Sequence, residues 1–344
     1  MPARFSIKSA PAAQTIDRRL HGKSGLMLVV MIPAYNEEKT IKQVIESIPR
    51  QIRGIDVVLP LVIDDGSTDK TGARATEAGA LVVTNATNQG LAYSFRTGLE
   101  SALQLGADII VNTDGDNQYD QSQIPDLIQP ILHRRANMVL GSRFSGNIEH
   151  MSFGKYWGNK LATWAVNIVS GANVTDGQTG FRAFTREAAM RLNVMSNFTY
   201  TQETILEAMD KHLTLEEIPI TFRKRADQNR LFGSVWNYAH RASSTLLMGL
   251  LKYHPLRTFL TAGVLFIVAG LVVGSRVIAQ FLTTGAIEPY LPSAVFTALF
   301  ILVGVQCAVL GLIATMLKQQ RQIIEMQLLE QRRARLAKIV KNDE

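Results

Sequence analysis

Two long segments near the C-terminal end of this chain contain no charged residue. They run from residue 258 to 275 and from residue 289 to 317, and a short link, 280–288, lies between them. As a helix, each is long enough to cross a hydrocarbon layer of about 30 Å, and a buried helix of a soluble protein rarely stays free of charge over such a length. The sequence therefore predicts a hairpin of two membrane-spanning helices, at 257–280 and 291–317.

Basic residues flank the outer ends of this hairpin. Residues 223–257 hold seven Lys or Arg and one Asp, and residues 318–344 hold seven Lys or Arg and four Asp or Glu. The link carries Glu288 but no Lys or Arg. Because Lys and Arg concentrate in cytoplasmic loops, this distribution predicts an integral membrane protein whose large N-terminal part, tail and both termini are cytoplasmic.

The rest of the chain divides into four parts around the hairpin. Residues 1–25 contain basic residues but no apolar run, so we expect a disordered lead and no signal peptide. Residues 26–230 are long enough for one α/β domain. Residues 231–256 mix apolar and basic side chains at helical spacing, which predicts amphipathic helices in the membrane interface. Residues 318–344 form a basic tail whose apolar residues could support a homo-oligomer; a solvated or membrane-surface helix explains them equally well.

The α/β domain is indicated by alternating apolar runs and helical patterns over 26–222, which predict a parallel sheet. The expected strands are 26–33, 57–63, 81–84, 107–111 and 138–140. A polar cluster follows each strand, and the first is expected to open a helix over 36–48. Because ligands of such sheets bind beyond the carboxyl ends of the strands, the clusters predict one site. They are Asn36-Glu37-Glu38, Asp64-Asp65-Gly66-Ser67-Thr68-Asp69, Asn88-Gln89-Gly90, Asp114-Gly115-Asp116-Asn117-Gln118 and Gly141-Ser142-Arg143.

The acidic cluster after the fourth strand has the composition of a metal site. Alternate residues of an extended chain point the same way, so Asp114, Asp116 and Gln118 can converge while Gly115 leaves room for a ligand. Hard oxygen ligands suit a hydrated Mg²⁺ or Mn²⁺ that also holds a diphosphate. A bare Asp-x-Asp is more often an ordinary polar junction, but the other clusters and the membrane-length segments favour the metal.

Several other classes lack their signatures here. No G-x-G-x-x-G follows the first strand and no G-x-x-x-x-G-K-[ST] occurs, which argues against a dinucleotide dehydrogenase and a P-loop ATPase. The single cysteine, Cys307, lies in the second uncharged segment and excludes an internal disulfide. No nucleic-acid-binding motif is present, so no nucleic acid partner is expected. The net charge of +7 instead suits a protein that binds the anionic headgroups of a membrane surface.

Five motifs in this order resemble the family 2 glycosyltransferases of GT-A fold, and within them the polyprenyl-phosphate glycosyltransferases typified by dolichyl-phosphate mannose synthase. The motifs are Pro33-Ala34-Tyr35-Asn36-Glu37, Asp64-Asp65-Gly66-Ser67, Asp114-Gly115-Asp116-Asn117-Gln118, Gly141-Ser142-Arg143 and Thr179-Gly180-Phe181-Arg182-Ala183-Phe184. The resemblance covers about residues 26–225 and extends to the hairpin in architecture only. It implies an α/β fold of GT-A type, with a Rossmann-like mixed sheet, followed by interfacial helices and a two-helix transmembrane hairpin.

The resemblance also implies how the donor is bound. Pro33, Tyr35 and Glu37 would contact the base and ribose of a nucleotide-sugar. Asp64 and Asp65 would face the same groups, because carboxylates accept hydrogen bonds from ring N–H and ribose hydroxyl groups; one of the two is alternatively a turn or cap residue.

The acidic cluster would hold the metal ion against the diphosphate. Asp114, Asp116 and Gln118 are the implied ligands, and the charge that grows on the nucleoside diphosphate leaving group would be neutralised there. Asp116 and Arg143 are the implied catalytic residues.

The acceptor in this group of enzymes is a lipid phosphate, which is already an anion and needs no strong general base. The site needs cations that bring two phosphates together. Arg143 resembles such a ligand, and Arg182 and Arg225 are further candidates because guanidinium binds phosphate in a bidentate way; the last two are equally well explained as solvated charges. Lys155 and Asn159 occupy positions comparable to an acceptor-binding pair in relatives.

The implied reaction is metal-dependent, inverting transfer of a hexose from a nucleotide-sugar of GDP-mannose or UDP-glucose type to polyprenyl or dolichyl phosphate at the cytoplasmic membrane face. A UDP-N-acetylhexosamine donor stays open. A processive polysaccharide synthase is disfavoured because no Gln-x-x-Arg-Trp motif occurs. A catalytically silent membrane scaffold is disfavoured because packing alone does not require Asp114, Asp116 and Arg143 together.

Overall fold

The computed structural model describes residues 25–149, 151–195, 200–224 and 235–342. It divides into two compact units. The first, which we call the sheet unit, comprises Met1–Thr245 and Leu328–Glu344. The second, the hairpin unit, comprises Leu246–Gln327.

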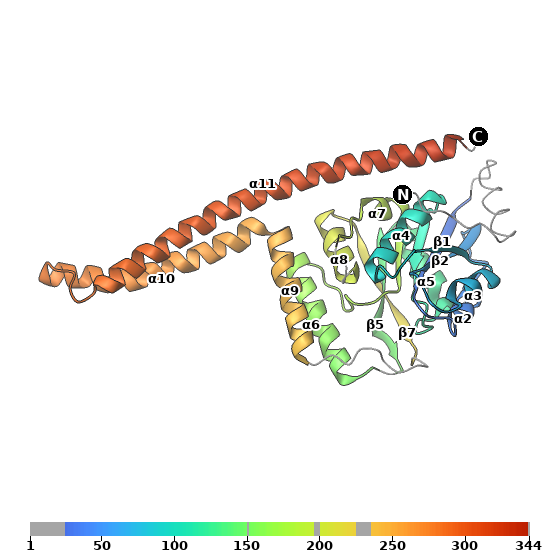
Figure 1. The fold of residues 1–344 in the computed structure, drawn as a ribbon, viewed down its shortest axis with the longest axis horizontal. Helices are drawn as coiled ribbons and strands as arrows, with labels where there is room; N and C mark the ends of the chain where they lie inside the picture. The colour runs from blue at the N-terminus through green and yellow to red at the C-terminus, as the bar shows by residue number, and fades with distance from the viewer. Residues whose placement is uncertain (1–24, 150, 196–199, 225–234, 343–344) are drawn as a thin grey trace. The chain divides into compact units, whose positions relative to one another are not determined.

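The sheet unit is built on a mixed sheet, of which β1, β2, β5 and β7 are labelled in Figure 1. The described strands follow the order β3-β2-β1-β4-β6-β5-β7. The five predicted strands are present and run in one direction. An unpredicted strand, β6, is antiparallel to both β4 and β5, between which it lies. The mixed sheet that the family resemblance implies is therefore confirmed, and the parallel sheet predicted from the alternating pattern is wrong. The strands are β1 (Met27–Ala34), β2 (Val57–Asp64), β3 (Leu81–Thr84), β4 (Ile109–Asn112), β5 (Met138–Ile148), β6 (Arg182–Thr185) and β7 (Leu215–Phe222).

Helices cover both faces of this sheet, so β1 is buried along its whole length. On one face, Leu28, Val30 and Ile32 share an apolar core with α2 and α5; on the other, α4 packs on β1 and β2. The helices of the sheet unit include α2 (Ile41–Glu46), α3 (Thr71–Glu77), α4 (Leu91–Gln104), the 3₁₀ turn η1 (Gln121–Gln123), α5 (Ile124–Leu132), α6 (Phe153–Ser170), α7 (Arg186–Arg191) and α8 (Tyr200–Asp210).

The predicted helix over 36–48 is wrong at its beginning. Asn36 has a left-handed backbone with φ of 55°, a conformation that asparagine tolerates better than most residues. α2 begins only at Ile41. Residues 35–40 are therefore a loop at the carboxyl end of β1, where they can contact the neighbouring loops.

The hairpin unit contains all of α10 (Pro255–Thr284) and most of α11 (Leu291–Asn342), and both helices are long and apolar enough to cross a membrane. The helices approach closely at glycines: a Cβ atom on Gly263 would lie 2.7 Å from the carbonyl oxygen of Gly304, and one on Gly274 would lie 2.8 Å from the Thr297 side chain. Small residues allow such backbone approach in membrane helices. Helix α9 (Val235–Tyr253) precedes the pair, within the segment predicted to hold interfacial helices.

α11 continues beyond the predicted end of the second span at 317 without a break. The tail is therefore part of one long helix instead of a separate short one, and its last described turns belong to the sheet unit. Of the predicted N-terminal lead, 1–25, only Gly25 is among the described residues. Residues 231–234 of the predicted interfacial segment also lie outside them.

Candidate active site

The loops after β1 and β2 are joined by hydrogen bonds at the carboxyl edge of the sheet. The Asn36 amide donates to Ser67 Oγ at 3.0 Å, and the Asn36 side-chain oxygen accepts from the Thr68 amide at 2.9 Å. The Glu37 amide donates to Thr71 Oγ1 at 2.9 Å. The first two predicted clusters therefore lie side by side, as expected for adjacent parallel strands.

Thr40 connects the first loop to the acidic cluster. Its hydroxyl donates to the carbonyl oxygen of Gly115 at 2.7 Å and lies 3.2 Å from Glu37 Oε2. Glu37 is consequently held close to the acidic cluster. The sequence did not single out Thr40, because its partner Gly115 is 75 residues away.

The residues predicted to face the nucleotide differ in their solvent exposure and in their hydrogen-bond partners. Pro33 is buried within β1, whereas Tyr35 is exposed. Asp64 accepts from the amide of Ser67 at 3.0 Å, which is the turn role given above as the alternative. Asp65 is buried, and its carboxylate organises the loop after β3: it accepts from Asn85 Nδ2 at 2.7 Å and from the amides of Gln89 at 3.0 Å and Gly90 at 2.8 Å.

The acidic cluster forms a turn, so the predicted extended geometry is wrong. β4 ends at Asn112, and Asn117 has a left-handed backbone with φ of 60°. Asp116 Oδ1 accepts from the amide of Gln118 at 3.1 Å. The Gln118 side-chain amide lies 3.4 Å from the carbonyl oxygen of Arg223. Gln118 thus also joins the cluster to the segment that follows β7.

Gly180 makes room for the Asp114 carboxylate. A Cβ atom on Gly180 would lie 2.8 Å from Asp114 Oδ1 and 3.0 Å from Oδ2. The Gly180 amide donates to the hydroxyl of Tyr119 at 2.8 Å, and its carbonyl oxygen accepts from Asn112 Nδ2 at 2.6 Å. Burial, with a contribution from Asp114, raises the pKa of Tyr119 to about 12, so this phenol stays neutral beside the carboxylate.

The acidic cluster suits a metal ion that arrives with a diphosphate better than a resident one. Among the described residues, no group of three His, Cys, Asp or Glu could hold a metal ion. Asp114 and Asp116 nevertheless offer two hard carboxylates within one turn. Mg²⁺ is commonly bound by one or two carboxylates together with substrate phosphates and waters, so this donor set fits.

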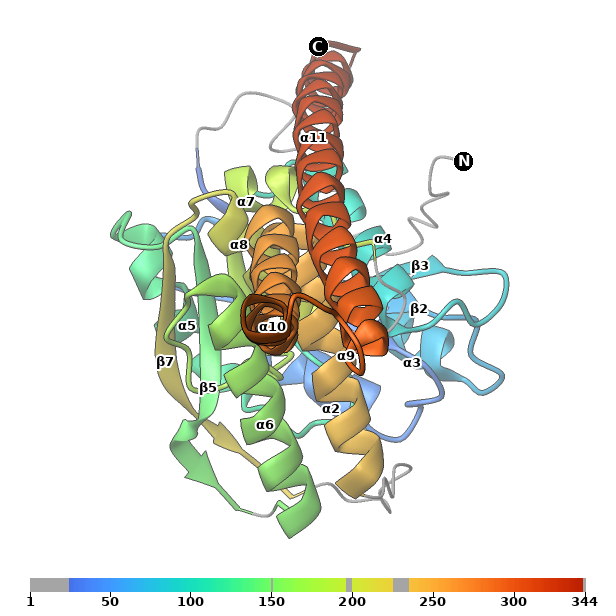
Figure 2. The same cartoon turned by 90° about the vertical axis from the view of Figure 1, so that its left-hand side faces the viewer.

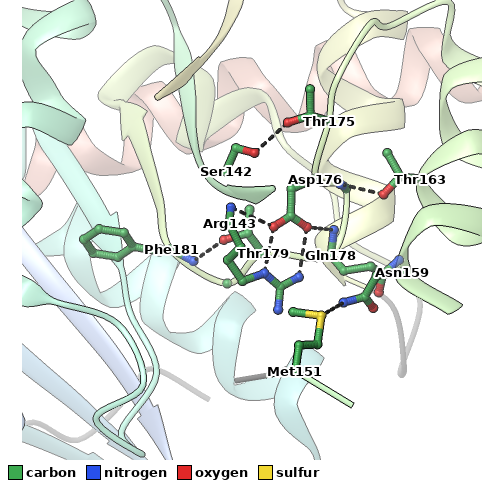
Figure 3. A network of polar contacts seen from close by, with 12 residues as sticks. Ser142, Arg143, Met151, Asn159, Thr163, Thr175, Asp176, Gln178, Thr179 and Phe181 are labelled. Carbon is green, nitrogen blue, oxygen red and sulfur yellow. Dashed lines mark hydrogen bonds and ion pairs between the residues drawn. The ribbon is translucent and has the colours of Figure 1, made fainter. Parts of the chain in front are cut away.

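Arg143 is buried at the end of the regular part of β5 and forms a bidentate ion pair with Asp176 (Figure 3). Its Nε lies 2.7 Å from Asp176 Oδ2 and its Nη2 lies 2.9 Å from Oδ1. Burial by itself would lower the pKa of Arg143, but the groups around it, Asp176 first and then Tyr119 and Asp114, together outweigh this effect and raise the pKa. The sequence prediction missed Asp176, although it stands in the polar run 175–178 just before the last motif.

Two lysines of α6 lie near the same guanidinium. Arg143 and Lys155 both approach the ring of Phe222, with Cζ and Nζ at 5.1 and 5.5 Å from its centroid. Arg143 and Lys160 both approach the ring of Phe144, at 5.9 and 4.3 Å. Three cations therefore gather around two aromatic rings, a favourable arrangement because the ring faces are electron-rich. We call Arg143, Lys155 and Lys160 the cation cluster.

Asn159, one turn after Lys155, points inward. It is buried, and its amide nitrogen lies 3.9 Å from the sulfur of Met151 (Figure 3). The structure thus brings the predicted Lys155 and Asn159 to the neighbourhood of Arg143. Lys160 was missed, because only the folded helix shows that it reaches Phe144.

The prediction of Arg182 as a phosphate ligand is wrong in this structure, because its side chain is fully buried. Its guanidinium donates to the carbonyl oxygens of Gly177, Thr179 and Thr201 at 3.2, 2.8 and 2.6 Å, and to the hydroxyl of Thr204. Burial lowers the pKa of Arg182 to about 10. Arg182 ties α8 to the loop that carries Asp176 and Gly180. Arg225 lies outside the described residues.

Comparisons with known proteins agree with this architecture. Residues 29–192 match the family model "Glycosyl transferase family 2". A UDP-N-acetylglucosamine–dolichyl-phosphate N-acetylglucosaminyltransferase of Methanococcus voltae is 30% identical over 56% of this chain and 84% of its own length. A dolichyl-phosphate hexose transferase of Haloferax volcanii is 29% identical over 59% of this chain and 86% of its own length.

A solved structure shows the same fold. Glucosyl-3-phosphoglycerate synthase from Mycobacterium tuberculosis, in complex with Mn²⁺, UDP and glucosyl-3-phosphoglycerate, is similar with a TM-score of 0.51 and 23% identity. The likeness covers 68% of this chain and 82% of the solved one. The predicted GT-A fold is confirmed.

Proposed function

This chain belongs to glycosyl transferase family 2, and from that membership we propose that it transfers a hexose from a nucleotide-sugar to the phosphate of a polyprenyl or dolichyl lipid. The observation that carries the proposal is the closeness of two opposite charges at one sheet edge. Asp114, in the acidic cluster, lies against Gly180, where a Cβ atom would be 2.8 Å from Asp114 Oδ1. Four residues earlier in the same loop, Asp176 pairs with Arg143 of the cation cluster at 2.7 Å. A metal-bound diphosphate and an anionic acceptor need these two environments next to each other.

The acidic cluster is the proposed donor site. Asp114 and Asp116 would hold Mg²⁺ or Mn²⁺ against the diphosphate, with Gln118 as a third oxygen donor. The bound metal ion would supply charge neutralisation at the departing nucleoside diphosphate. Tyr35 and Glu37 border the cluster through the loop held by Thr40, where they would contact the base and ribose; Asp65 would support them by ordering the loop after β3.

The cation cluster is the proposed acceptor site. An acceptor phosphate is already an anionic nucleophile, so no residue has to remove a proton from it at neutral pH. Arg143 is held by Asp176 in a buried ion pair, and Lys155 and Lys160 add two further positive charges. Their task is to overcome the repulsion between two phosphates and to fix the attacking oxygen. Attack opposite the leaving diphosphate would invert the anomeric configuration.

Two relatives of this chain act on dolichyl phosphate according to their names, and the chain carries two helices apolar enough to span a membrane. A lipid acceptor explains why a transferase would carry such helices. From the basic flanks we infer that the sheet unit lies on the cytoplasmic side. A UDP-N-acetylhexosamine donor is the second candidate, because the Methanococcus voltae relative is named for one.

The purified full chain can test this function directly. It is incubated with Mg²⁺ or Mn²⁺, a short polyprenyl phosphate and a panel of radiolabelled nucleotide-sugars. We expect label from one donor in the lipid extract, lost on addition of EDTA and in Asp116→Ala. Hydrolysed donor without labelled lipid, or label in a polymer, would contradict the lipid-phosphate acceptor and would favour a polysaccharide synthase in the second case.

A further inference from the structure

Helix α6 presents an apolar stripe to the outside of the sheet unit. Phe153, Trp157, Leu161, Trp164 and Ile168 follow one another at intervals of three or four residues, so they share one helix face. Their side chains are between 39% and 79% exposed. We call these five residues the α6 stripe; in Figure 2, α6 faces the viewer in front of the sheet.

The opposite face of α6 is the one that packs on the protein. Gly158, Asn159, Thr163, Val166 and Val169 are buried, and α6 packs against α8. A surface helix of a soluble domain normally turns polar residues outward. α6 turns its largest apolar side chains outward instead. Exposed stripes of this kind mark an interaction surface.

The composition of α6 identifies a bilayer as the occupant. Lys155 and Lys160 are its only charged residues, so the helix is basic. Tryptophan is enriched at membrane–water interfaces, and helices that lie in the interface combine Lys or Arg with Trp, Phe and Leu. The same chain continues into two helices that are long and apolar enough to span a membrane.

We propose that the α6 stripe is a membrane-docking surface, which lies in the headgroup region of a bilayer containing anionic lipid. This inference rests on the proposed function and deepens it. Lys155 is on the same helix as Trp157 and approaches the ring of Phe222, beside Arg143. Docking of α6 places the cation cluster at the depth where the phosphate of a polyprenyl lipid emerges.

Tryptophan fluorescence tests the surface without reference to activity. The chain has three tryptophans, and Trp157 and Trp164 belong to the α6 stripe. Trp236→Phe with Trp164→Phe keeps only Trp157, and Trp236→Phe with Trp157→Phe keeps only Trp164. Each full-length variant is reconstituted in phosphatidylcholine–phosphatidylglycerol vesicles. We expect lipids brominated near the glycerol end of the acyl chain to quench both single tryptophans, and aqueous iodide to leave them largely unaffected.

A tryptophan elsewhere on the sheet unit provides the control. Lys42 of α2 has an exposed side chain, and Lys42→Trp in a background with the three native tryptophans changed to Phe should show the opposite pattern. Quenching of Trp157 and Trp164 by iodide but not by brominated lipid would overturn the proposal. Shielding from both quenchers would also overturn it, because a protein surface, such as a second copy of the chain, would then cover the stripe.

The link to catalysis is measured separately. The double variant Trp157→Ser with Trp164→Ser should raise the KM for vesicle-borne polyprenyl phosphate about tenfold and leave the KM for the donor unchanged. The matched control, Trp157→Phe with Trp164→Phe, should retain most of the acceptor affinity. An unchanged acceptor KM would overturn the link. Quenching by brominated lipid without any lipid-linked product would support the docking surface and contradict the proposed function. Lipid-linked product without quenching would support the proposed function and contradict the docking surface.

Discussion

Arg143 and Asp176 depend on each other because both charges are buried. Removing one partner of a buried ion pair leaves the other uncompensated, which typically costs about 3–5 kcal/mol, whereas replacing both by apolar residues is often nearly neutral. The pair therefore has two separable roles, one in stability and one in the proposed binding of phosphate.

We expect Asp176→Ala to lower the free energy of unfolding by about 3–5 kcal/mol, measured by urea unfolding in detergent. Arg143→Met with Asp176→Leu should recover most of this stability but not the transfer of sugar to lipid. Full activity of the double variant would show that Arg143 is structural only.

The same pair predicts how stability depends on pH. Burial would raise the pKa of Asp176, but the Arg143 guanidinium lowers it below the ordinary value. A depressed folded pKa stabilises the protein above the unfolded pKa of about 3.9, and this stabilisation is lost as the pH falls through the folded value. Below about pH 4, unfolding free energy should fall more steeply in the wild type than in Arg143→Met with Asp176→Leu. Parallel curves would contradict this prediction.

Gly180 offers a sharp test of the donor site. In Gly180→Ala the new methyl group would lie 2.8 Å from Asp114 Oδ1, so the carboxylate has to move, and we expect at least about a tenfold loss of kcat/KM, since small misplacements of catalytic groups are costly. Gly177→Ala in the same loop is the matched control, because its nearest neighbour would be at 3.4 Å. Equal activities would argue against a role for Asp114.

At the scale of elements, the end of α11 docks on α7. Arg332 donates to the carbonyl oxygens of Met190 and Leu192 at 2.9 and 3.4 Å, and Leu336 is buried. The last carbonyls of a helix lack partners within the helix, and a cation there is favourable. The basic tail, which as a sequence looks like a solvated charge run, thus caps a helix of the sheet unit.

Arg332→Ala should accordingly expose the end of α7. Losing hydrogen bonds from a charged donor costs about 1.5–3 kcal/mol, and faster amide exchange is expected over α7 and residues 192–195. Arg335→Ala is the control, because its 3.5 Å pair with Glu100 is exposed on both sides and such pairs contribute about 0–1 kcal/mol. Unchanged exchange in Arg332→Ala would show that the contact is dispensable.

At the scale of the whole molecule, the hairpin predicts a topology. Cys307 is the only cysteine, so Cys307→Ala gives a background for single-cysteine labelling. A cysteine replacing Ala286, in the link, should react with a membrane-impermeant maleimide in intact cells. One replacing Lys42 in the sheet unit should react only after permeabilisation. The reverse pattern would contradict the cytoplasmic placement of the sheet unit.

The sequence by itself determined the architecture at the level of local pattern. Apolar runs located five strands, and four of the five polar clusters follow their strands as expected; the fifth, at 141–143, lies within β5, which continues to Ile148. Charge-free segments located two membrane-length helices. These features could be predicted because each depends on a few consecutive residues. The motifs added the family, and with it the mixed sheet that periodicity alone did not reveal.

Only the tertiary structure decided what the individual side chains do. It buried Arg182, paired Arg143 with Asp176 33 residues away, placed Gly180 against Asp114 and turned the α6 stripe outward. Each outcome depends on contacts between segments far apart in the chain, and a charged or aromatic residue looks the same in sequence whether it faces solvent, a partner or a bilayer. Burial and partner geometry, which set the pKa and the role of each group, exist only after folding.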